Sequence, residues 1–412
     1  MDRRFFLKSG SLLLGSSLLP RWVWAAAQSS TETLKGQEPI FVFIVQRGAM
    51  DGLSLLAPVA DPEYFKLRPN IAIKTVGTKD HFAIDSHFAL HPAAAALQPI
   101  WKEGTLSFVV QSGSMDGTRS HFDAQDYLEN GVPGSKTVTD GFLSRALPEL
   151  SHPGALSAVA MQLFMPKVLQ GNSLAISMNS LKDYSLKAPF ENTEHAVGNF
   201  EAMYQSATNK VLRETGISAF HSMHDIQDST AGKGFNEYLK QFPKSTTGRR
   251  LGEIAWMITT GMGVQIAVTD IGGWDTHVYQ GSNEGRLADR IRELSEAMAA
   301  FKTVLGAHWS RVVMVTATEF GRTVAENGTQ GTDHGHGSVM MISGGRVHGG
   351  RVLGSWSELK KQNLYEERDV PVTTDFRQVF SEVLKSHLGI KDMAKVFPHW
   401  NNSHGDLRIF RS

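Results

Sequence analysis

The sequence contains no cysteine, and this absence excludes several kinds of site. Without a thiol, the chain cannot form a disulfide, carry a lipid on cysteine, hold an iron–sulfur cluster or bind zinc through thiolates. A metal bound to this chain must therefore be held by His, Asp, Glu, Ser or Thr side chains.

An excess of charge of either sign is also absent, because 41 basic residues balance 41 acidic residues in the 412-residue chain. This balance gives no general electrostatic reason to expect nucleic acid or an anionic membrane as a partner. Hydrophobic residues make up 41% of the sequence and charged residues 20%, which are ordinary values for a globular protein with a large core. We therefore expect a folded protein without a nucleic-acid partner.

The first 27 residues have the pattern of a cleavable export signal. They begin MDRRFFLK, continue with an apolar stretch and end in three alanines, so we expect cleavage after Ala27. RRFFLK resembles a twin-arginine signal, which predicts export by the twin-arginine translocase to the periplasm or the medium. Such substrates generally cross the membrane folded, often with a cofactor already bound. A membrane anchor is the alternative, but the apolar part is short and is interrupted by Gly15, Pro20 and Arg21, so we expect no stable span after cleavage.

Apolar runs alternate with helical patterns after residues 28–38, a polar segment that we interpret as a linker. Continuous apolar runs rich in β-branched residues are typical of buried parallel strands. We expect such strands at residues 41–46, 106–111, 264–270 and 311–318, with a further strand at 338–343.

Two segments between and after these runs have the periodicity of helices that pack on a sheet. At about residues 283–306, apolar side chains recur every three or four positions, and a second helix begins at Thr373 or Thr374. Strands that alternate with helices predict an α/β fold, an α/β/α sandwich around a mostly parallel sheet, over residues 39–412. The more polar segment at about 180–250 is interpreted as a helix-rich insertion.

Polar, glycine-rich segments follow the predicted strands at the points where the strands end. In open α/β sheets, ligands bind at the carboxyl ends of the strands, so these segments should meet at one edge. They are RGAMDGLS with Asp51, SGSMDGTRSHFDAQ with Asp116, Arg119, Ser120 and His121, IGGWDTH with Asp275 and His277, EFGRT with Arg322, and GTDHGHG with Asp333, His334 and His336.

Carboxylates and imidazoles without thiolates suit Zn²⁺, with Mn²⁺ and Ca²⁺ as the alternatives. Asp275 and His277 lie on one side of the chain if the segment is extended. The adjacent Asp333 and His334 can bind one ion only if the chain turns sharply, which the glycines of GTDHGHG permit. His336 is either a further ligand or a residue that orients one. A structural turn is the alternative for Asp51 and for the GGWDTH segment.

Ser120 precedes the amphipathic segment HFDAQDYLEN and would ordinarily cap a helix there. The same position allows a functional role, because a hydroxyl at a helix N-terminus lies in a field that favours an oxyanion, and a nearby metal would make it a nucleophile. Arg119 or Arg322 could hold a phosphate or sulfate through its planar guanidinium. For both arginines the alternative is a surface ion pair. The position of Arg119 favours that alternative for Arg119.

Five of these motifs, RGAMDGLS, SHFDAQDYLE, GGWDTH, EFGRT and GTDHGHGS, resemble in their order a large bacterial family of exported proteins, domain of unknown function 1501. That family is placed in the alkaline phosphatase and sulfatase superfamily. The resemblance implies an alkaline-phosphatase-like fold with one or two divalent metals at the strand ends. Asp51 resembles the superfamily's first metal-binding aspartate, and Asp333 with His334 its Asp-His pair. Asp275 and His277 resemble the ligands of the other metal, although the superfamily more often separates those two further.

The resemblance also implies a nucleophile at a helix N-terminus, for which Ser120 is the candidate, although its context lacks the sulfatase and phosphatase signatures. The resulting hypothesis is an exported metal-dependent hydrolase of phosphate or sulfate esters, small or polymeric, acting through a metal-activated Ser120 or water with Arg322 at the transition state. The alternative hypothesis is a non-catalytic exported metal-binding or assembly protein on the same scaffold.

Overall fold

A computed structural model of the chain describes residues 37–74, 82–151, 154–172, 174–184, 193–403 and 405–411. The predicted signal at 1–27 and nearly all of the predicted linker at 28–38 lie outside these residues. The chain divides into Met1–Glu38 and Pro39–Ser412, and only the second unit is described below. No helix in the described part of the chain combines the length and apolar character needed to cross a membrane.

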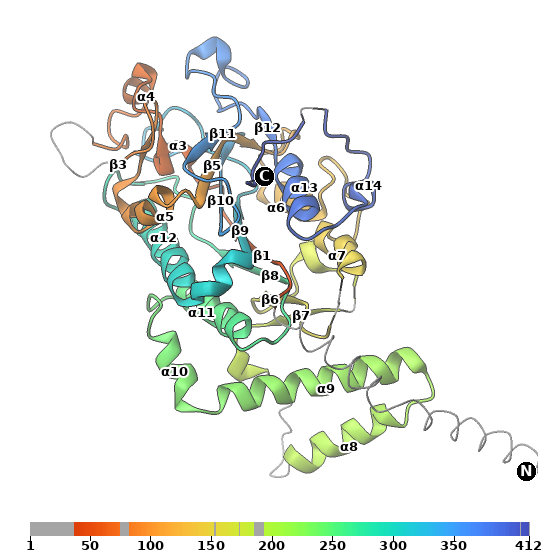
Figure 1. The fold of residues 1–412 in the computed structure, drawn as a ribbon. Helices are drawn as coiled ribbons and strands as arrows, with labels where there is room; N and C mark the ends of the chain where they lie inside the picture. The colour runs from red at the N-terminus through yellow and green to blue at the C-terminus, as the bar shows by residue number, and fades with distance from the viewer. Residues whose placement is uncertain are drawn as a thin grey trace, which may run out of the picture. The chain divides into compact units, whose positions relative to one another are not determined.

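A mixed, mostly parallel β-sheet forms the centre of the Pro39–Ser412 unit (Figure 1). Its order is β11-β5-β10-β9-β1-β8-β6-β7, with β12 also paired to β5. Only β10 runs antiparallel to its neighbours β9 and β5, so the other strands point in one direction. The bounds are β1 (Ile40–Gln46), β5 (Leu106–Gly113), β6 (Ala158–Met161), β7 (Ala175–Met178), β8 (Ile266–Ile271), β9 (Val312–Ala317), β10 (Ser338–Gly344), β11 (Arg351–Leu353) and β12 (Thr374–Asp375).

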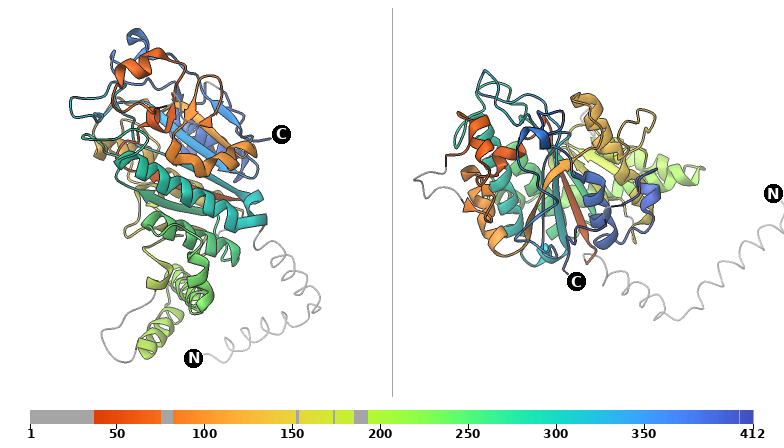
Figure 2. Two further views of the ribbon diagram at one scale, coloured as in Figure 1. Left: turned by 90° about the vertical axis from the view of Figure 1, so that its left-hand side faces the viewer. Right: turned by 90° about the horizontal axis from the view of Figure 1, so that it is seen from above.

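Helices cover both faces of this sheet (Figure 2), and a small second sheet joins β2 (Leu56–Ala57), β4 (Ala89–Leu90) and β3 (Phe82–Ala83). The α-helices are α3 (Gly52–Leu55), α4 (Pro62–Leu67), α5 (Gln98–Lys102), α6 (His121–Asn130), α7 (Phe142–Ala146), α8 (Thr193–Gln205), α9 (Lys210–Thr230), α10 (Lys233–Leu239), α11 (Thr246–Thr259), α12 (Arg286–Leu305), α13 (Phe376–Ser386) and α14 (Met393–Val396). Short 3₁₀ helices are η2 (Pro92–Leu97), η3 (Leu147–Glu149), η4 (Lys167–Leu169), η5 (Leu181–Asp183), η6 (Gly306–Arg311) and η7 (Lys361–Asn363).

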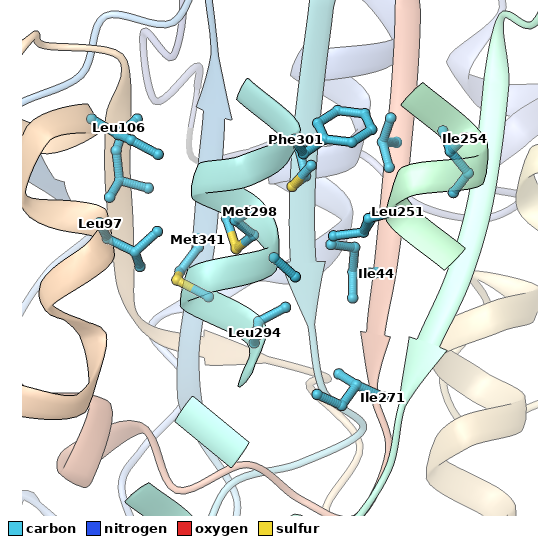
Figure 3. Packing of buried hydrophobic residues seen from close by; sticks show 14 of the residues in the cluster. Ile44, Leu97, Leu106, Leu251, Ile254, Ile271, Leu294, Met298, Phe301 and Met341 are labelled. Atoms are coloured by element: carbon cyan, nitrogen blue, oxygen red, sulfur yellow. The ribbon is translucent and has the colours of Figure 1, made fainter. Parts of the chain in front are cut away.

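The sheet separates two hydrophobic cores because successive side chains of a strand point to opposite faces. In β1, Ile44 belongs to the core under α11 and α12, whereas Phe43 belongs to the core under α7 and α13. Figure 3 shows the first core, where Leu251 of α11 and Met298 of α12 pack against the strands. Burial on both faces explains why β1, β5, β9 and β10 are buried at every position and mostly apolar rather than alternating.

The α/β fold and its five predicted strands are confirmed, each to within two residues. The predicted cap of the last long helix is wrong: α13 begins after Asp375, whose carboxylate accepts the Arg377 N–H at 2.8 Å. Thr374 instead extends the sheet by pairing with Ser112 in β5. Helices α8, α9 and α10 occupy the segment predicted as an insertion, and the insertion itself stays a prediction.

Candidate metal centre

Three chain segments that leave the sheet at the carboxyl ends of its parallel strands bring four polar side chains together. His121 is the first residue of α6, which follows β5. Asp275 and His277 follow β8, and His334 lies in the connection between β9 and β10. Because β10 is antiparallel, its first residues lie at the same edge as the last residues of its neighbours.

Ring nitrogens of His121 and His334 and a carboxylate oxygen of Asp275 lie within 4.8 Å of one another, and a ring nitrogen of His277 adjoins the last two. Nε2 of His334 lies 3.0 Å from Nε2 of His121 and 3.1 Å from Nε2 of His277. Oδ1 of Asp275 lies 3.0 Å, 3.3 Å and 3.7 Å from the Nε2 atoms of His277, His334 and His121. Ligands about 2.1 Å from a tetrahedral Zn²⁺ are separated by about 3.4 Å, so these spacings match those of a metal-binding set.

The opposite nitrogen of each imidazole is bonded to an oxygen acceptor. These acceptors are the Glu319 carboxylate for His121 at 2.8 Å, the Asp333 carboxylate for His277 at 3.1 Å and the Arg119 carbonyl for His334 at 3.0 Å. Because carbonyls and ionised carboxylates only accept, each Nδ1 donates to its outer acceptor, and an Nε2 without a proton would present its lone pair to a cation in the cluster. Metal-binding histidines are held in this way by outer acceptors.

Glu319 is a further residue of the candidate site that the sequence motifs did not single out. Its side chain is fully buried, and besides His121 it accepts hydrogen bonds from the Gly48 N–H at 2.8 Å and the Gln125 amide at 3.0 Å. Burial alone would raise the pKa of Glu319, but the hydrogen bonds from His121 and Gln125 hold it below its usual value. The bond to Glu319 in turn raises the pKa of His121. Its position directly after β9 is the signal that could have identified it.

Arg322 positions the loops of the cluster and is fully buried itself. Its Nε donates to the Ala49 carbonyl at 2.8 Å, and its terminal nitrogens donate to the carbonyls of Gly48 at 2.9 Å and Thr332 at 3.1 Å. It also pairs with the Asp275 carboxylate. Burial raises the pKa of Asp275, but this pairing outweighs it, so the pKa is lowered. Since all three guanidinium nitrogens are used, this placement does not support the predicted contact of Arg322 with a substrate anion.

Asp51 lies in a buried ion pair rather than in the cluster. Arg68, also fully buried, donates to both carboxylate oxygens of Asp51 at 2.6 and 3.1 Å, and Ser54 and Gln280 each donate at 2.7 Å. Burial would raise the pKa of Asp51, but the charge of Arg68 lowers it overall. The structure therefore does not bring Asp51 to the His121, Asp275 and His334 group, whose ligand atoms lie within 4.8 Å of one another.

The two remaining polar residues of GTDHGHG surround the cluster rather than face it. Asp333 orients His277 and also accepts from the Asn327 amide at 3.1 Å. His336 is buried and stacks on Tyr365, with ring centroids 4.2 Å apart, and burial lowers its pKa. Neither placement is that of a direct ligand.

The glycines of this segment act through close packing instead of through an unusual backbone angle. A Cβ on Gly331 would lie 2.2 Å from the His277 carbonyl oxygen, and one on Gly335 would lie 2.4 Å from the Arg322 carbonyl oxygen. Neither glycine has a positive φ. The loop carrying His334 can therefore pack directly against the other loops of the site.

Ser120 caps a helix and Arg119 forms ion pairs, which are the alternatives to the functional roles considered for them. Ser120 is the N-cap of α6, where its Oγ accepts the Asp123 N–H at 3.5 Å. The Arg119 guanidinium pairs with the carboxylates of Asp369 at 2.6 Å and Glu366 at 2.7 Å. Ser120 nevertheless lies beside the cluster in the chain, between the carbonyl that holds His334 and the ligand candidate His121.

Several solved structures are similar to this chain at low identity. The lipoteichoic acid synthase LtaP from Listeria monocytogenes is 8% identical, with a TM-score of 0.33, over 87% of this chain and 74% of that one. Ps i-CgsB, in complex with k-i-k-neocarrahexaose, is 11% identical, with a TM-score of 0.31, over 86% and 72%. An alkaline phosphatase from the Antarctic bacterium TAB5 is 10% identical, with a TM-score of 0.27, over 74% and 92%. Likenesses at this level assign no activity to the chain.

A search of curated protein sequences gives no match. A family profile, in contrast, matches residues 39–399, which is nearly the whole Pro39–Ser412 unit and includes all four residues of the cluster. The chain therefore belongs to the family described as "Protein of unknown function (DUF1501)".

Proposed function

We propose that this chain is an exported metal-dependent hydrolase of phosphate or sulfate esters, with a divalent metal held by His121, Asp275, His277 and His334. The observation that carries the proposal is the proximity of three Nε2 atoms and one carboxylate oxygen, with each Nδ1 bonded to an outer acceptor. The nitrogen-rich donor set suits Zn²⁺ best. A divalent cation bound there would polarise an ester oxygen and lower the pKa of a coordinated water.

The surroundings of the cluster give its residues distinct tasks. Glu319 and Asp333 hold the imidazoles of His121 and His277 in the tautomer that can bind a cation. The ligand side chains are 24% exposed for His121 and 44% for Asp275, so a substrate can reach the cluster from solvent. A purely structural zinc site is ordinarily closed, whereas a catalytic one keeps an open side.

Ser120 is the proposed nucleophile of a covalent route, and water is that of a direct route. The hydroxyl lies at the N-terminus of α6, where the helix dipole favours negative charge on an attacking oxygen. Its bond to the Asp123 N–H is long, at 3.5 Å, so little would be lost if the hydroxyl turned towards a substrate. We place this activity outside the cytoplasm, because the RRFFLK signal would direct the chain to export.

A second candidate function is an exported metal-binding protein without turnover. The observation that favours it is the engagement of both arginines that sequence reasoning assigned to substrate. Arg322 is bonded to backbone carbonyls and Asp275, and Arg119 is paired with Asp369 and Glu366. Neither guanidinium is therefore left to neutralise an ester anion.

One experiment separates the two functions. Full-length protein folded in the cytoplasm is analysed for bound metal and then assayed on aryl phosphate, phosphodiester and aryl sulfate esters. A hydrolase should contain about one divalent ion per chain, and His334→Ala should abolish both metal binding and turnover. Ser120→Ala should abolish turnover while keeping the metal if the serine attacks, and should keep turnover if water attacks. Metal without turnover on any ester would reject the hydrolase and favour the second function. Absence of metal would reject both.

A further inference from the structure

A cavity of about 400 Å³ lies at the N-terminus of α13, beside β12 and the loop that follows α14. Its volume is within the usual range of small-molecule sites, about 300 to 1,000 Å³. Met115, Val372, Thr373, Asp375, Gln378, Trp400, Asn401, Asn402 and Ser403 line it. None of these residues belongs to the metal centre, so this site does not rest on the proposed function.

Two side-chain amides in the cavity wall are fixed by one shared backbone acceptor. The Gln378 and Asn402 amide nitrogens both donate to the Gly405 carbonyl, at 2.6 and 3.0 Å. This shared partner fixes which end of each amide is the nitrogen and leaves both oxygens as acceptors. Gln378 is only 5% exposed, and Oδ1 of Asn402 is buried with no hydrogen-bond partner in the described part of the chain. A buried acceptor without a donor is costly, so Oδ1 of Asn402 is an acceptor to which a ligand hydroxyl could donate.

The charge of the cavity is balanced, which favours a neutral ligand over an ionic one. Among the described residues of the wall, Asp375 is the only charged one, and Arg377 pairs with it at 2.6 Å. The same guanidinium lies over the Trp400 ring, 5.6 Å from its centroid, so a ligand cation at this ring would be repelled. An anion gains no unpaired cation from these lining residues.

The remaining wall offers apolar surface beside the acceptors. Trp400 is partly exposed, and Met115 is 57% exposed although it is a large hydrophobic residue. A tryptophan face binds flat apolar surface, and the thioether of methionine adapts to irregular shapes. The ligand must therefore combine hydroxyl donors with a flat C–H face, as a pyranose ring does.

We propose that this cavity binds a saccharide unit, with its hydroxyl groups donating to Gln378 and Asn402 and its C–H face packed on Trp400. The full-length protein is tested first against an array of neutral oligosaccharides. It is then titrated calorimetrically with maltose, cellobiose, lactose and chitobiose, together with any array glycan that binds. Saturable binding of at least one neutral glycan is expected, and Trp400→Ala should weaken it at least tenfold.

Two further variants keep the test decisive if Trp400→Ala proves unstable. Gln378→Met keeps the length of the side chain and removes its acceptor, and Asn401→Ala alters an exposed lining residue, so both should weaken binding in a folded protein. Phe200→Ala, which removes an exposed aromatic from α8, is the matched control and should bind as the wild type does.

Removal of metal with a chelator should leave glycan binding unchanged, which separates this site from the metal centre. Loss of binding on chelation would instead place the glycan at the metal and overturn the proposal. Binding of no neutral glycan, or equal binding by wild type, Trp400→Ala and Gln378→Met, would also overturn it.

Discussion

Replacing Glu319 by glutamine should weaken metal binding without removing any proposed ligand. The carboxylate accepts from His121 Nδ1 at 2.8 Å, and glutamine keeps one oxygen for that bond but loses the negative charge. That bond is the main cause of the raised pKa of His121, so its loss makes the ring a poorer donor to a cation. Removing an outer partner of a metal-binding histidine typically costs about 10- to 100-fold in affinity, or about 1.4 to 2.7 kcal/mol. We expect about tenfold for this substitution, because the hydrogen bond itself can persist.

The assay is a competition titration of zinc between the full-length protein and a chromophoric chelator, for wild type and Glu319→Gln. Glu253→Gln is the matched control, since Glu253 is equally buried and also holds a loop, accepting from Ser180 at 2.8 Å and from the Leu181 N–H at 3.1 Å. The control should bind zinc as the wild type does. An unchanged zinc affinity in Glu319→Gln, or an equal loss in the control, would refute the argument that Glu319 acts through His121.

Three further predictions concern stability. Arg68→Met leaves the buried charge of Asp51 without its partner and should lower the free energy of unfolding by about 3 to 5 kcal/mol in urea denaturation; an unchanged midpoint would contradict the ion pair. Burial lowers the pKa of His387 to about 4, against about 6.5 in the unfolded chain, so its contribution is complete above pH 6.5 and is lost as the pH falls towards 4. The wild type should thus lose about 2 kcal/mol between pH 7.5 and 5 from this residue, and urea titrations of His387→Gln should lack that loss. Zinc at about 100 times its Kd should raise the free energy of unfolding by about 2.7 kcal/mol, and His334→Ala should show no such rise in thermal unfolding.

The sheet could be predicted from the sequence because its central strands are buried on both faces and are therefore mostly apolar. The start of α13 could not be predicted in the same way. Thr373, Thr374 and Asp375 are all good caps, and the choice depends on the pairing of Thr374 with Ser112, which is 262 residues away in β5. Local pattern gives the type of an element, whereas tertiary pairing decides its boundary.

The rule that polar side chains gather at the carboxyl ends of strands brought Asp275, His277 and His334 into one predicted site, as the structure has them. It assigned no role to His121, although it placed that residue in the same set of segments. It also included Asp51, which Arg68 holds elsewhere. Nothing in the local sequence shows that an arginine 17 residues further on will bind this carboxylate.

The guanidinium of Arg322 ties together loops that are made at very different times during synthesis. Gly48 precedes Arg322 by 274 residues, which corresponds to roughly 15 to 55 s of translation at about 5 to 20 residues per second. If the chain binds a metal as proposed, the nascent chain cannot select it, because the loops carrying the donors have no fixed geometry until nearly the whole chain has been made and folded. The compartment in which the chain folds is then the compartment whose metal pool it samples. On the proposed twin-arginine route that pool is cytoplasmic. The protein would therefore bind its ion in the cytoplasm and cross the membrane with the ion already bound.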